Sequence, residues 1–161
     1  MMAEKLIVGI SDWKICKNPD VLITYALGSC IGTCIYDRNT GIAGLSHIML
    51  PDSKAITDGG STRMKFADTA IPDMVQEMRR CGASASGLTA KIAGGAVMFQ
   101  TSSGAFNIGE RNIAAVKAAL ASLGIPIIAE DTGKNYGRTV TFTSENGAVE
   151  VSSAIKGKII I

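Results

Sequence analysis

The sequence predicts an α+β (mixed α/β) fold: a mixed β-sandwich flanked by two main helices. Three observations support this prediction. Many short segments show the period-two alternation or the β-branched apolar runs of strands, and two longer segments carry apolar residues at helical spacing. The strands and helices do not alternate regularly, which disfavours a parallel α/β sheet. Because 161 residues fit one core and no segment resembles a linker, we expect a single domain spanning residues 1–161.

The first third of the chain predicts strands separated by short turns. Residues 6–10 form a short apolar run, and residues 21–26 are mostly apolar on both faces, which is typical of a central strand. Residues 31–36 and 42–48 follow as the two arms of a hairpin, because the residues between them have turn chemistry. We expect residues 12–20, which contain the only tryptophan, to form a connection.

The rest of the chain predicts two helices and further strands. Apolar residues between Ala67 and Met78 recur at helical spacing, and this helix tolerates Pro72 if it begins near residue 68 or 69, whereas a start near residue 63 would require a kink. Asn107 has the form of an N-cap for a second helix that ends before Gly124. Strands are expected at residues 88–93, 125–129, 138–143 and 148–152, with an edge strand at 159–161.

Composition and charge exclude several classes of function. The net charge is +2, basic and acidic residues are intermixed, and aromatic residues make up 5% of the chain, so we expect no nucleic-acid partner. No apolar stretch approaches the roughly 18 residues that span a bilayer, so the protein is not expected to be membrane-inserted. The N-terminus lacks the arrangement of a secretory signal, which predicts a cytoplasmic location.

The four cysteines predict reduced thiols and no metal site. They lie at positions 16, 30, 34 and 81, in a chain far too large to need disulfides for stability. No pair has the spacing of a zinc knuckle, and a single histidine completes no familiar set of ligands. We therefore expect neither a metal nor any other cofactor.

The only histidine, His47, is predicted to face Cys30. If residues 37–40 form a four-residue hairpin loop, Tyr36 pairs with Gly41, and counting back along both strands sets Cys30 opposite His47. Directly opposed residues of an antiparallel pair have Cβ atoms about 4.5–5.5 Å apart, so the thiol and the imidazole would approach hydrogen-bonding range. A β-bulge would change this register.

This pair is a candidate for acyl transfer by a cysteine nucleophile. A histidine that holds the proton of the thiol lowers the cysteine pKa from about 8.5 toward roughly 3.5–7.5. Backbone N–H groups of the turn at Gly28 and Ser29 are candidates to bind the oxyanion, and Gly28 permits close approach of the backbone. Thr24 is a candidate to orient His47 by its hydroxyl or its main-chain carbonyl.

The residues alone leave other interpretations open. A lone histidine on a strand is more often a structural residue, and Cys34 shares a strand face with Cys30 and is the rival nucleophile, although a buried small residue is the simpler interpretation. A redox switch that joins Cys30 to Cys34 is disfavoured, because strand residues four apart on one face lie about 13 Å from each other, beyond disulfide reach.

Several motifs resemble those of the chemoreceptor glutamine deamidase family, CheD. The segments that carry the resemblance are Leu27-Gly28-Ser29-Cys30, Gly44-Leu45-Ser46-His47-Ile48-Met49-Leu50-Pro51, Lys65-Phe66-Ala67-Asp68, Ala90-Lys91-Ile92-Ala93-Gly94-Gly95-Ala96 with Met98-Phe99, Asn107-Ile108-Gly109 with Arg111-Asn112, and Ala129-Glu130-Asp131-Thr132-Gly133 with Gly137-Arg138. Lys134 departs from the pattern, since family members often have glycine there. The similarity spans nearly the whole chain.

The resemblance implies a cytoplasmic cysteine amidohydrolase of bacterial or archaeal chemotaxis. It would convert glutamine side chains of methyl-accepting chemotaxis receptors to glutamate with release of ammonia, and some family members also hydrolyse receptor methyl esters. The family's nucleophile falls on Cys30, its histidine on His47 and its threonine on Thr24. The implied fold is a mixed α/β sandwich distantly like that of glutamine-deamidating toxins, and the implied partners are the receptors and a CheC-type phosphatase.

An alternative hypothesis is a non-catalytic docking module. Such a protein would bind receptors and a CheC-type phosphatase, and would keep Cys30 and His47 for packing alone. The two hypotheses differ in ammonia release, which only the enzyme predicts.

Overall fold

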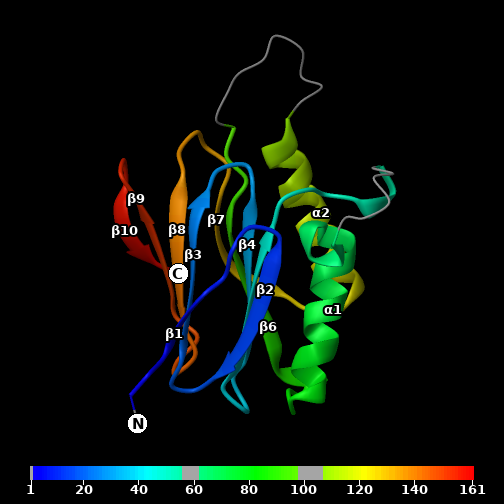
Figure 1. Cartoon of the computed structure of the whole chain (residues 1–161), viewed down its shortest axis with the longest axis vertical. Helices are drawn as coiled ribbons and strands as arrows, with labels where there is room; N and C mark the ends of the chain where they lie inside the picture. Colours follow the sequence, from blue (N-terminus) through cyan, green and yellow to red (C-terminus); the bar gives the residue numbers. More distant parts are fainter. Residues whose placement is uncertain (1, 56–61, 98–106) are drawn as a thin grey trace.

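The computed structural model describes residues 2–55, 62–97 and 107–161, and Figure 1 shows their arrangement. Ten strands form two five-stranded sheets, and two α-helices lie to one side of them. The predicted α+β fold with a mixed β-sandwich and two main helices is therefore confirmed.

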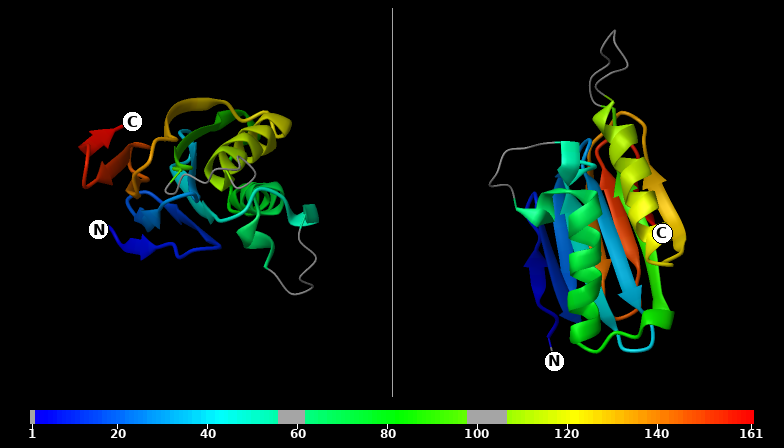
Figure 2. Two further views of the ribbon diagram at one scale, coloured as in Figure 1. Left: turned by 90° about the horizontal axis from the view of Figure 1, so that it is seen from above. Right: turned by 90° about the vertical axis from the view of Figure 1, so that its right-hand side faces the viewer.

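In the described part of the chain, no helix packs on the outer sheet (Figure 2). Its first two strands run parallel and its other pairs are antiparallel. In spatial order the strands are β1 (Lys5–Ile7), β3 (Val21–Leu27), β8 (Arg138–Thr143), β9 (Val149–Ser153) and β10 (Gly157–Ile160).

The central sheet lies between the outer sheet and the helices, so the described chain forms three layers (Figure 2). In spatial order its strands are β2 (Asp12–Lys17), β5 (Ile42–Ile48), β4 (Ile31–Asp37), β6 (Leu88–Gly94) and β7 (Ile127–Thr132). Helices α1 (Ala67–Arg80) and α2 (Ile108–Ser122) cover its outer face.

Two hydrophobic cores separate the three layers. The first lies between the central sheet and the helices and includes Ile35, Ile71 and Leu120. The second lies between the two sheets and includes Leu45 and Phe142. Because successive side chains of a strand point to opposite faces, β4 and β5 supply residues to both cores, which explains why β5 is buried along its whole length.

The expected connection at residues 12–20 is wrong over most of its length. Residues Asp12–Lys17 form β2, which pairs antiparallel with β5 at one edge of the central sheet. Trp13 and Ile15 pack against the helix-side core, while Lys14 between them is exposed. Trp13, Lys14 and Ile15 thus alternate as on a half-exposed strand, and lysines are common on edge strands because they discourage pairing with other chains.

The other predicted elements are present with small shifts in their bounds. Helix α1 begins at Ala67, after a 3₁₀ turn at Arg63–Lys65, and contains Pro72. Helix α2 begins after Asn107, although the Asn107 side chain makes no capping hydrogen bond. Strand β7 starts two residues later than predicted and extends to Thr132, and β10 forms the expected edge.

The register of the β4–β5 hairpin differs from the prediction. Asp37 pairs with Ile42, and Gly32 pairs with His47. The loop has four residues as expected, but it spans residues 38–41 instead of 37–40. Cys30 is therefore not directly opposite His47, and that prediction is wrong by two residues.

The side chain of Asp37 explains the shift. Its carboxylate accepts hydrogen bonds from the backbone N–H groups of Asn39 and Ser84, at 3.0 and 2.8 Å. Gly41 adopts a φ of 74° and donates its N–H to the Asp37 carbonyl. Asp37 is thus the last residue of the strand, and Gly41 belongs to the turn because glycine adopts this left-handed conformation at little cost.

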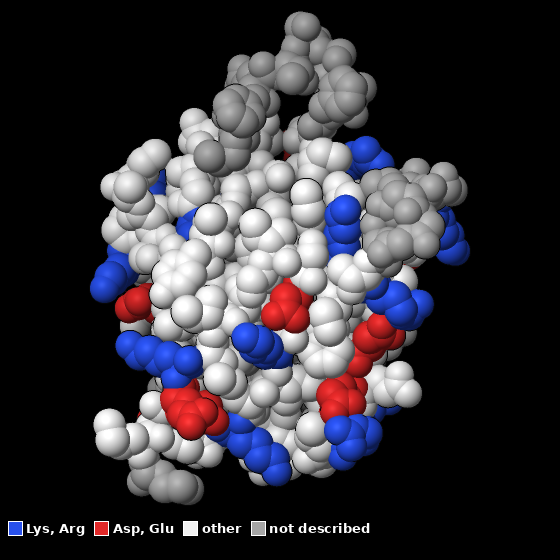
Figure 3. Space-filling view, viewed as in Figure 1, with Lys and Arg blue, Asp and Glu red and all other residues white. Residues whose placement is uncertain are grey.

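The surface that faces the viewer in Figure 3 carries interspersed basic and acidic side chains. No helix in the described part of the chain is long and apolar enough to cross a membrane.

Candidate functional site

The candidate site lies where the two sheets meet at the end of the sandwich that holds the turn between β3 and β4. His47, on β5 of the central sheet, is fully buried. Its Nδ1 lies 2.7 Å from Oγ1 of Thr24, which is on β3 of the outer sheet and is also fully buried. The prediction that Thr24 contacts His47 through its hydroxyl therefore agrees with the geometry.

The tautomer of His47 follows from a third residue, Val8. The Thr24 hydroxyl donates to the main-chain oxygen of Val8 at 2.7 Å, and that oxygen can only accept. A hydroxyl has one proton, so towards His47 the Thr24 oxygen accepts, and Nδ1 of the neutral ring must carry the hydrogen. The lone pair of His47 then resides on Nε2, which is buried and has no hydrogen-bond partner among the described residues.

Thr24 points inward by its regular alternation with Leu22, and a β-bulge follows it on β3. Thr24 pairs with Val140 and Leu27 pairs with Arg138, so two residues of β3 oppose a single residue of β8. One of the two, Ala26, has a φ of 60°, the left-handed region that L-residues rarely adopt. The bulge lets Thr24 and Leu27 both point inward although they are three residues apart, which plain alternation would forbid.

Burial keeps His47 neutral. Desolvation lowers the pKa of its imidazole from 6.5 to about 4. A neutral ring with a free Nε2 is a proton acceptor at pH 7. His47 is therefore a candidate for the general base.

Cys30 lies one residue before β4, on the face that packs between the sheets, and its side chain is half-buried. The position that pairs directly with His47 is Gly32, so Cys30 is a diagonal neighbour of the histidine, and Gly32 places no side chain between them. No hydrogen bond joins the Cys30 thiol to His47 in the described residues. Burial raises the pKa of the Cys30 thiol above its ordinary value, so the expectation of a lowered pKa does not hold for the resting site.

The turn that carries Cys30 is fixed through three successive carbonyl groups. Gly28 O accepts from the N–H of Ala96, and Cys30 O accepts from the N–H of Gly95, each at 2.9 Å. Ser29 O accepts from the side-chain amide of Asn112, also at 2.9 Å. The backbone N–H groups of this turn make fewer hydrogen bonds than its carbonyl groups.

The amide N–H of Gly28 donates to the carbonyl of Ala26. Within the described residues, the N–H groups of Ser29 and Cys30 have no hydrogen-bond partner. In the turn predicted to bind an oxyanion, the N–H of Gly28 is thus occupied, and the N–H groups of Ser29 and Cys30 remain candidate donors.

Two glycines allow the turn to approach β6. A Cβ added to Gly94, which has a φ of 111°, would overlap the Cys30 carbonyl oxygen. A Cβ added to Gly95 would lie 2.5 Å from a side-chain carbon of Ile113 on α2. At Gly94 the closely packed group is therefore the backbone of Cys30.

Sequence reasoning missed two residues of this site. Val8 acts through its main-chain oxygen, for which the sequence carries no signal. Asn112 did carry a sequence signal, because it falls four residues before Val116 and eight before Leu120 on the buried stripe of α2. A polar residue on an apolar stripe requires hydrogen-bond partners, and those of Asn112 lie in the site.

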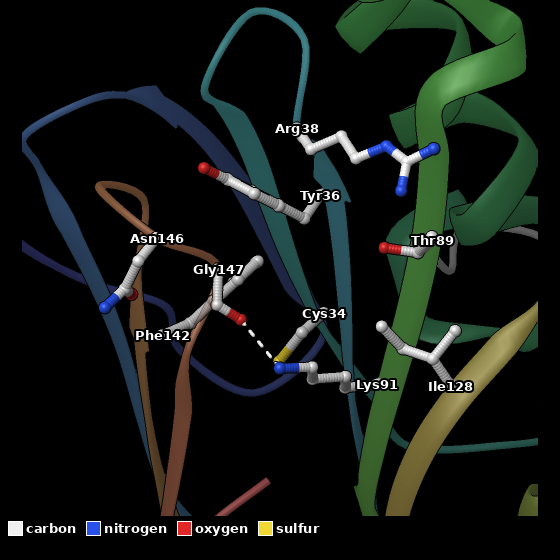
Figure 4. A pocket seen from close by; sticks show the side chains of 9 residues that line it. All are labelled: Cys34, Tyr36, Arg38, Thr89, Lys91, Ile128, Phe142, Asn146 and Gly147. Atoms are coloured by element: carbon white, nitrogen blue, oxygen red, sulfur yellow. Dashed lines mark hydrogen bonds between the residues drawn. The ribbon is translucent and has the colours of Figure 1, made fainter.

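The rival nucleophile, Cys34, lies elsewhere and in a different environment. It lines a cavity of about 190 Å³ beside the β4–β5 hairpin, at the opposite end of β4 from Cys30 (Figure 4). The ammonium of Lys91 lies nearby and donates to Gly147 O at 3.0 Å. Burial nevertheless raises the pKa of the Cys34 thiol strongly, against the smaller opposite effect of Lys91. Cys34 is therefore a poor nucleophile, and this cavity holds no histidine.

All four cysteines are free thiols. Across residues 2–55, 62–97 and 107–161, no three His, Cys, Asp or Glu side chains cluster as metal ligands would.

The comparisons with known proteins agree on one family. A family model described as "CheD chemotactic sensory transduction" matches residues 49–153. A protein of Caldanaerobacter subterraneus is 50% identical over 155 residues, which cover 95% of each chain. A protein of Lachnoclostridium phytofermentans is 46% identical over 96% of this chain and 97% of its own, and one of Clostridium botulinum is 49% identical over 95% of each. Each is named "Probable chemoreceptor glutamine deamidase CheD".

Proposed function

Because the chain belongs to the CheD family, we propose that it is a cysteine amidohydrolase that converts glutamine side chains of methyl-accepting chemotaxis receptors to glutamate, with release of ammonia. The names of the relatives support the reaction and the substrate. The observation that carries the mechanism is the chain of hydrogen bonds from Val8 through Thr24 to His47, which leaves Nε2 as a base beside the Cys30 turn.

In the first half-reaction, His47 Nε2 takes the thiol proton of Cys30 as the sulfur attacks the carboxamide carbon. The carbonyl oxygen becomes an oxyanion, and the N–H groups of Ser29 and Cys30 stabilise it. Nε2–H then gives its proton to the amide nitrogen, which leaves as ammonia, and a thioester remains on Cys30.

In the second half-reaction, His47 Nε2 takes a proton from water, and the hydroxide attacks the thioester. The sulfur of Cys30 leaves and recovers the proton from Nε2–H. The sum is glutamine plus water to glutamate plus ammonium, once the new carboxylic acid has given its proton to ammonia, and the site returns to a neutral thiol and a neutral imidazole. Proton transfer accompanies attack, because burial disfavours the charged form of both groups before substrate binds.

The surroundings of the site suit a protein substrate. Ile10 and Met49 are large apolar side chains that are 60 and 40% exposed. The Met49 carbonyl shares the Asn112 amide with Ser29 of the Cys30 turn, and the Ile10 segment is joined to β5 because Ser11 N donates to His47 O. Exposed apolar side chains on the segments next to the site fit a side chain presented on a helix better than they fit a free small molecule.

The same mechanism extends to receptor methyl esters, from which methanol would leave in place of ammonia. We include in the proposal a cytoplasmic location and a CheC-type phosphatase that competes with receptor for the surface around Cys30. Competition is measurable as an increase in the apparent KM for receptor when the phosphatase is added. An unchanged KM at saturating phosphatase would remove this partner from the proposal.

The test of the enzyme is ammonia release with a one-dalton mass gain on a receptor cytoplasmic fragment. We expect the gain with the wild type and with Cys34→Ala, and its loss with Cys30→Ala while receptor binding remains. Binding without a mass gain in the wild type, across several receptors, would instead support the non-catalytic docking module.

A further inference from the structure

We propose that Asn112 is a positioning residue that sets the separation of Cys30 and His47. Its side chain is fully buried and lies on α2, in a different layer from both residues. The Nδ2 group donates to Ser29 O at 2.9 Å and to Met49 O at 3.1 Å. One amide therefore holds the residue before the nucleophile and a residue just beyond the base.

These contacts lie where the hairpin ladder ends. The last pair between β4 and β5 is Ile31 with Ile48, and beyond it the two chains separate. Both partners of Asn112 are carbonyl oxygens, so both hydrogens of its NH₂ group are used and the orientation of the amide is fixed. The Asn112 side chain replaces the next rung of the ladder, between Ser29 and Met49, just beyond the last regular pair.

Other interactions hold each half of the site separately. Thr24 fixes the His47 ring, and the N–H of Gly95 holds the Cys30 carbonyl. Among these interactions, that of Asn112 spans both chains at their point of separation. Because proton transfer and attack depend steeply on distance, loss of this link should reduce turnover more than it reduces receptor binding.

The inference rests on the proposed function for its kinetic readout alone, and a second readout is independent of it. Asn112→Ala should lower kcat at least about tenfold with little change in KM. It should also change the rate at which iodoacetamide alkylates Cys30 relative to the exposed Cys81 in the same molecule. Ser144→Ala is the matched control, since its buried hydroxyl donates to Asp20 O at the other end of β8. It should leave both readouts unchanged.

Asn112→Asp separates positioning from packing, because it keeps the shape of the side chain. An ionised carboxylate cannot donate to two carbonyls, whereas the protonated acid regains one donor. The kcat of Asn112→Asp relative to wild type should therefore rise as the pH falls from 8 to 5.

Wild-type kcat and an unchanged alkylation ratio in Asn112→Ala would overturn the inference. A kcat ratio for Asn112→Asp that does not vary with pH would do so as well. If the wild type itself releases no ammonia, the proposed function fails, and the alkylation ratio still tests the position of Cys30.

Discussion

At the scale of residues, the site is built from neutral groups. Cys30 is a thiol and His47 an uncharged imidazole, because desolvation opposes the charge on each. Thr24 decides which nitrogen of His47 is the base, and it does so because Val8 O takes its only proton. Under the proposed mechanism the reactive thiolate forms only when substrate is attacked, so the resting site holds no free thiolate that is open to side reactions.

A pH dependence of stability follows from His47. The folded pKa is about 4, while an unfolded histidine titrates near 6.5. Between these values the unfolded chain binds more protons than the folded one. The free energy of unfolding therefore rises with pH and levels off above about pH 6.5. We expect stability to fall by on the order of 2–3 kcal/mol as the pH drops from 6.5 to 4.

Urea denaturation at a series of pH values measures this dependence. His47→Asn is the control, because it lacks the titrating ring. Ordinary carboxyl groups titrate at roughly pH 4, so the slope between pH 4.5 and 6.5 reports on the histidine. An equal slope in wild type and His47→Asn would show that His47 is not held neutral.

At the scale of elements, the chemistry depends on where regular strands end. The bulge in β3 after Thr24 turns Leu27 inward, the ladder between β4 and β5 stops one residue after Cys30, and β6 ends at Gly94 against the Cys30 carbonyl. Irregular backbone at strand ends releases polar groups from the ladder. The N–H groups of Ser29 and Cys30, which have no partner among the described residues, are an example.

A pair of glycines tests this dependence. Gly94→Ala must move the Cys30 turn, because the new Cβ would overlap the Cys30 carbonyl oxygen, so we expect a loss of ammonia release together with lower stability. Gly133→Ala is matched in backbone strain, with a φ of 80°, but no heavy atom lies within 4 Å of its added Cβ. It should cost about 1–2 kcal/mol of stability, measured in urea, and retain activity. Equal activity of the two variants would contradict the account of the turn.

At the scale of the whole molecule, the two sheets must keep a constant separation, since Thr24 and His47 come from different sheets. The side chain of Arg138 contributes to this. It is buried at the start of β8 and donates to Asp131 Oδ2 on β7 at 2.9 Å, so the ion pair joins the outer sheet to the central one. The same guanidinium lies 4.5 Å from the ring centroid of Tyr136.

Asp131→Ala should cost about 3 kcal/mol, because it leaves the buried Arg138 cation without a counter-charge. The comparison is Asp73→Ala, which breaks the ion pair with the exposed Arg63 and should cost less than about 1 kcal/mol. Urea denaturation of the two variants gives both values. Similar losses in both would mean that the Arg138 pair does not join the sheets as described.

Much of the molecule could be predicted from the sequence, because alternation and helical spacing report burial directly. The strand faces of the β4–β5 hairpin were right, since a register error of two residues keeps every side chain on its face. The partner of His47 was wrong, because the pattern cannot say whether Asp37 closes the strand or opens the turn. The strand β2 was missed although Trp13, Lys14 and Ile15 alternate, because so short a run between polar residues also fits a connection.

The side chains of the site were predictable in part, although Asn112 was missed, and its backbone contributions were not predictable. Thr24 and His47 do meet. The bulge at Ala26, the Val8 carbonyl and the occupied N–H of Gly28 depend on the fold of both sheets, and no residue type announces them.

The most direct test of the resting site is nitrogen-15 NMR of the imidazole, because the chain has one histidine and the spectrum holds a single ring. At pH 7 we predict a neutral ring protonated at Nδ1, with Nε2 bare, and a loss of this preference in Thr24→Val but not in Thr24→Ser. A protonated imidazolium, or a hydrogen on Nε2 in the wild type, would contradict the assignment of His47 as the neutral base.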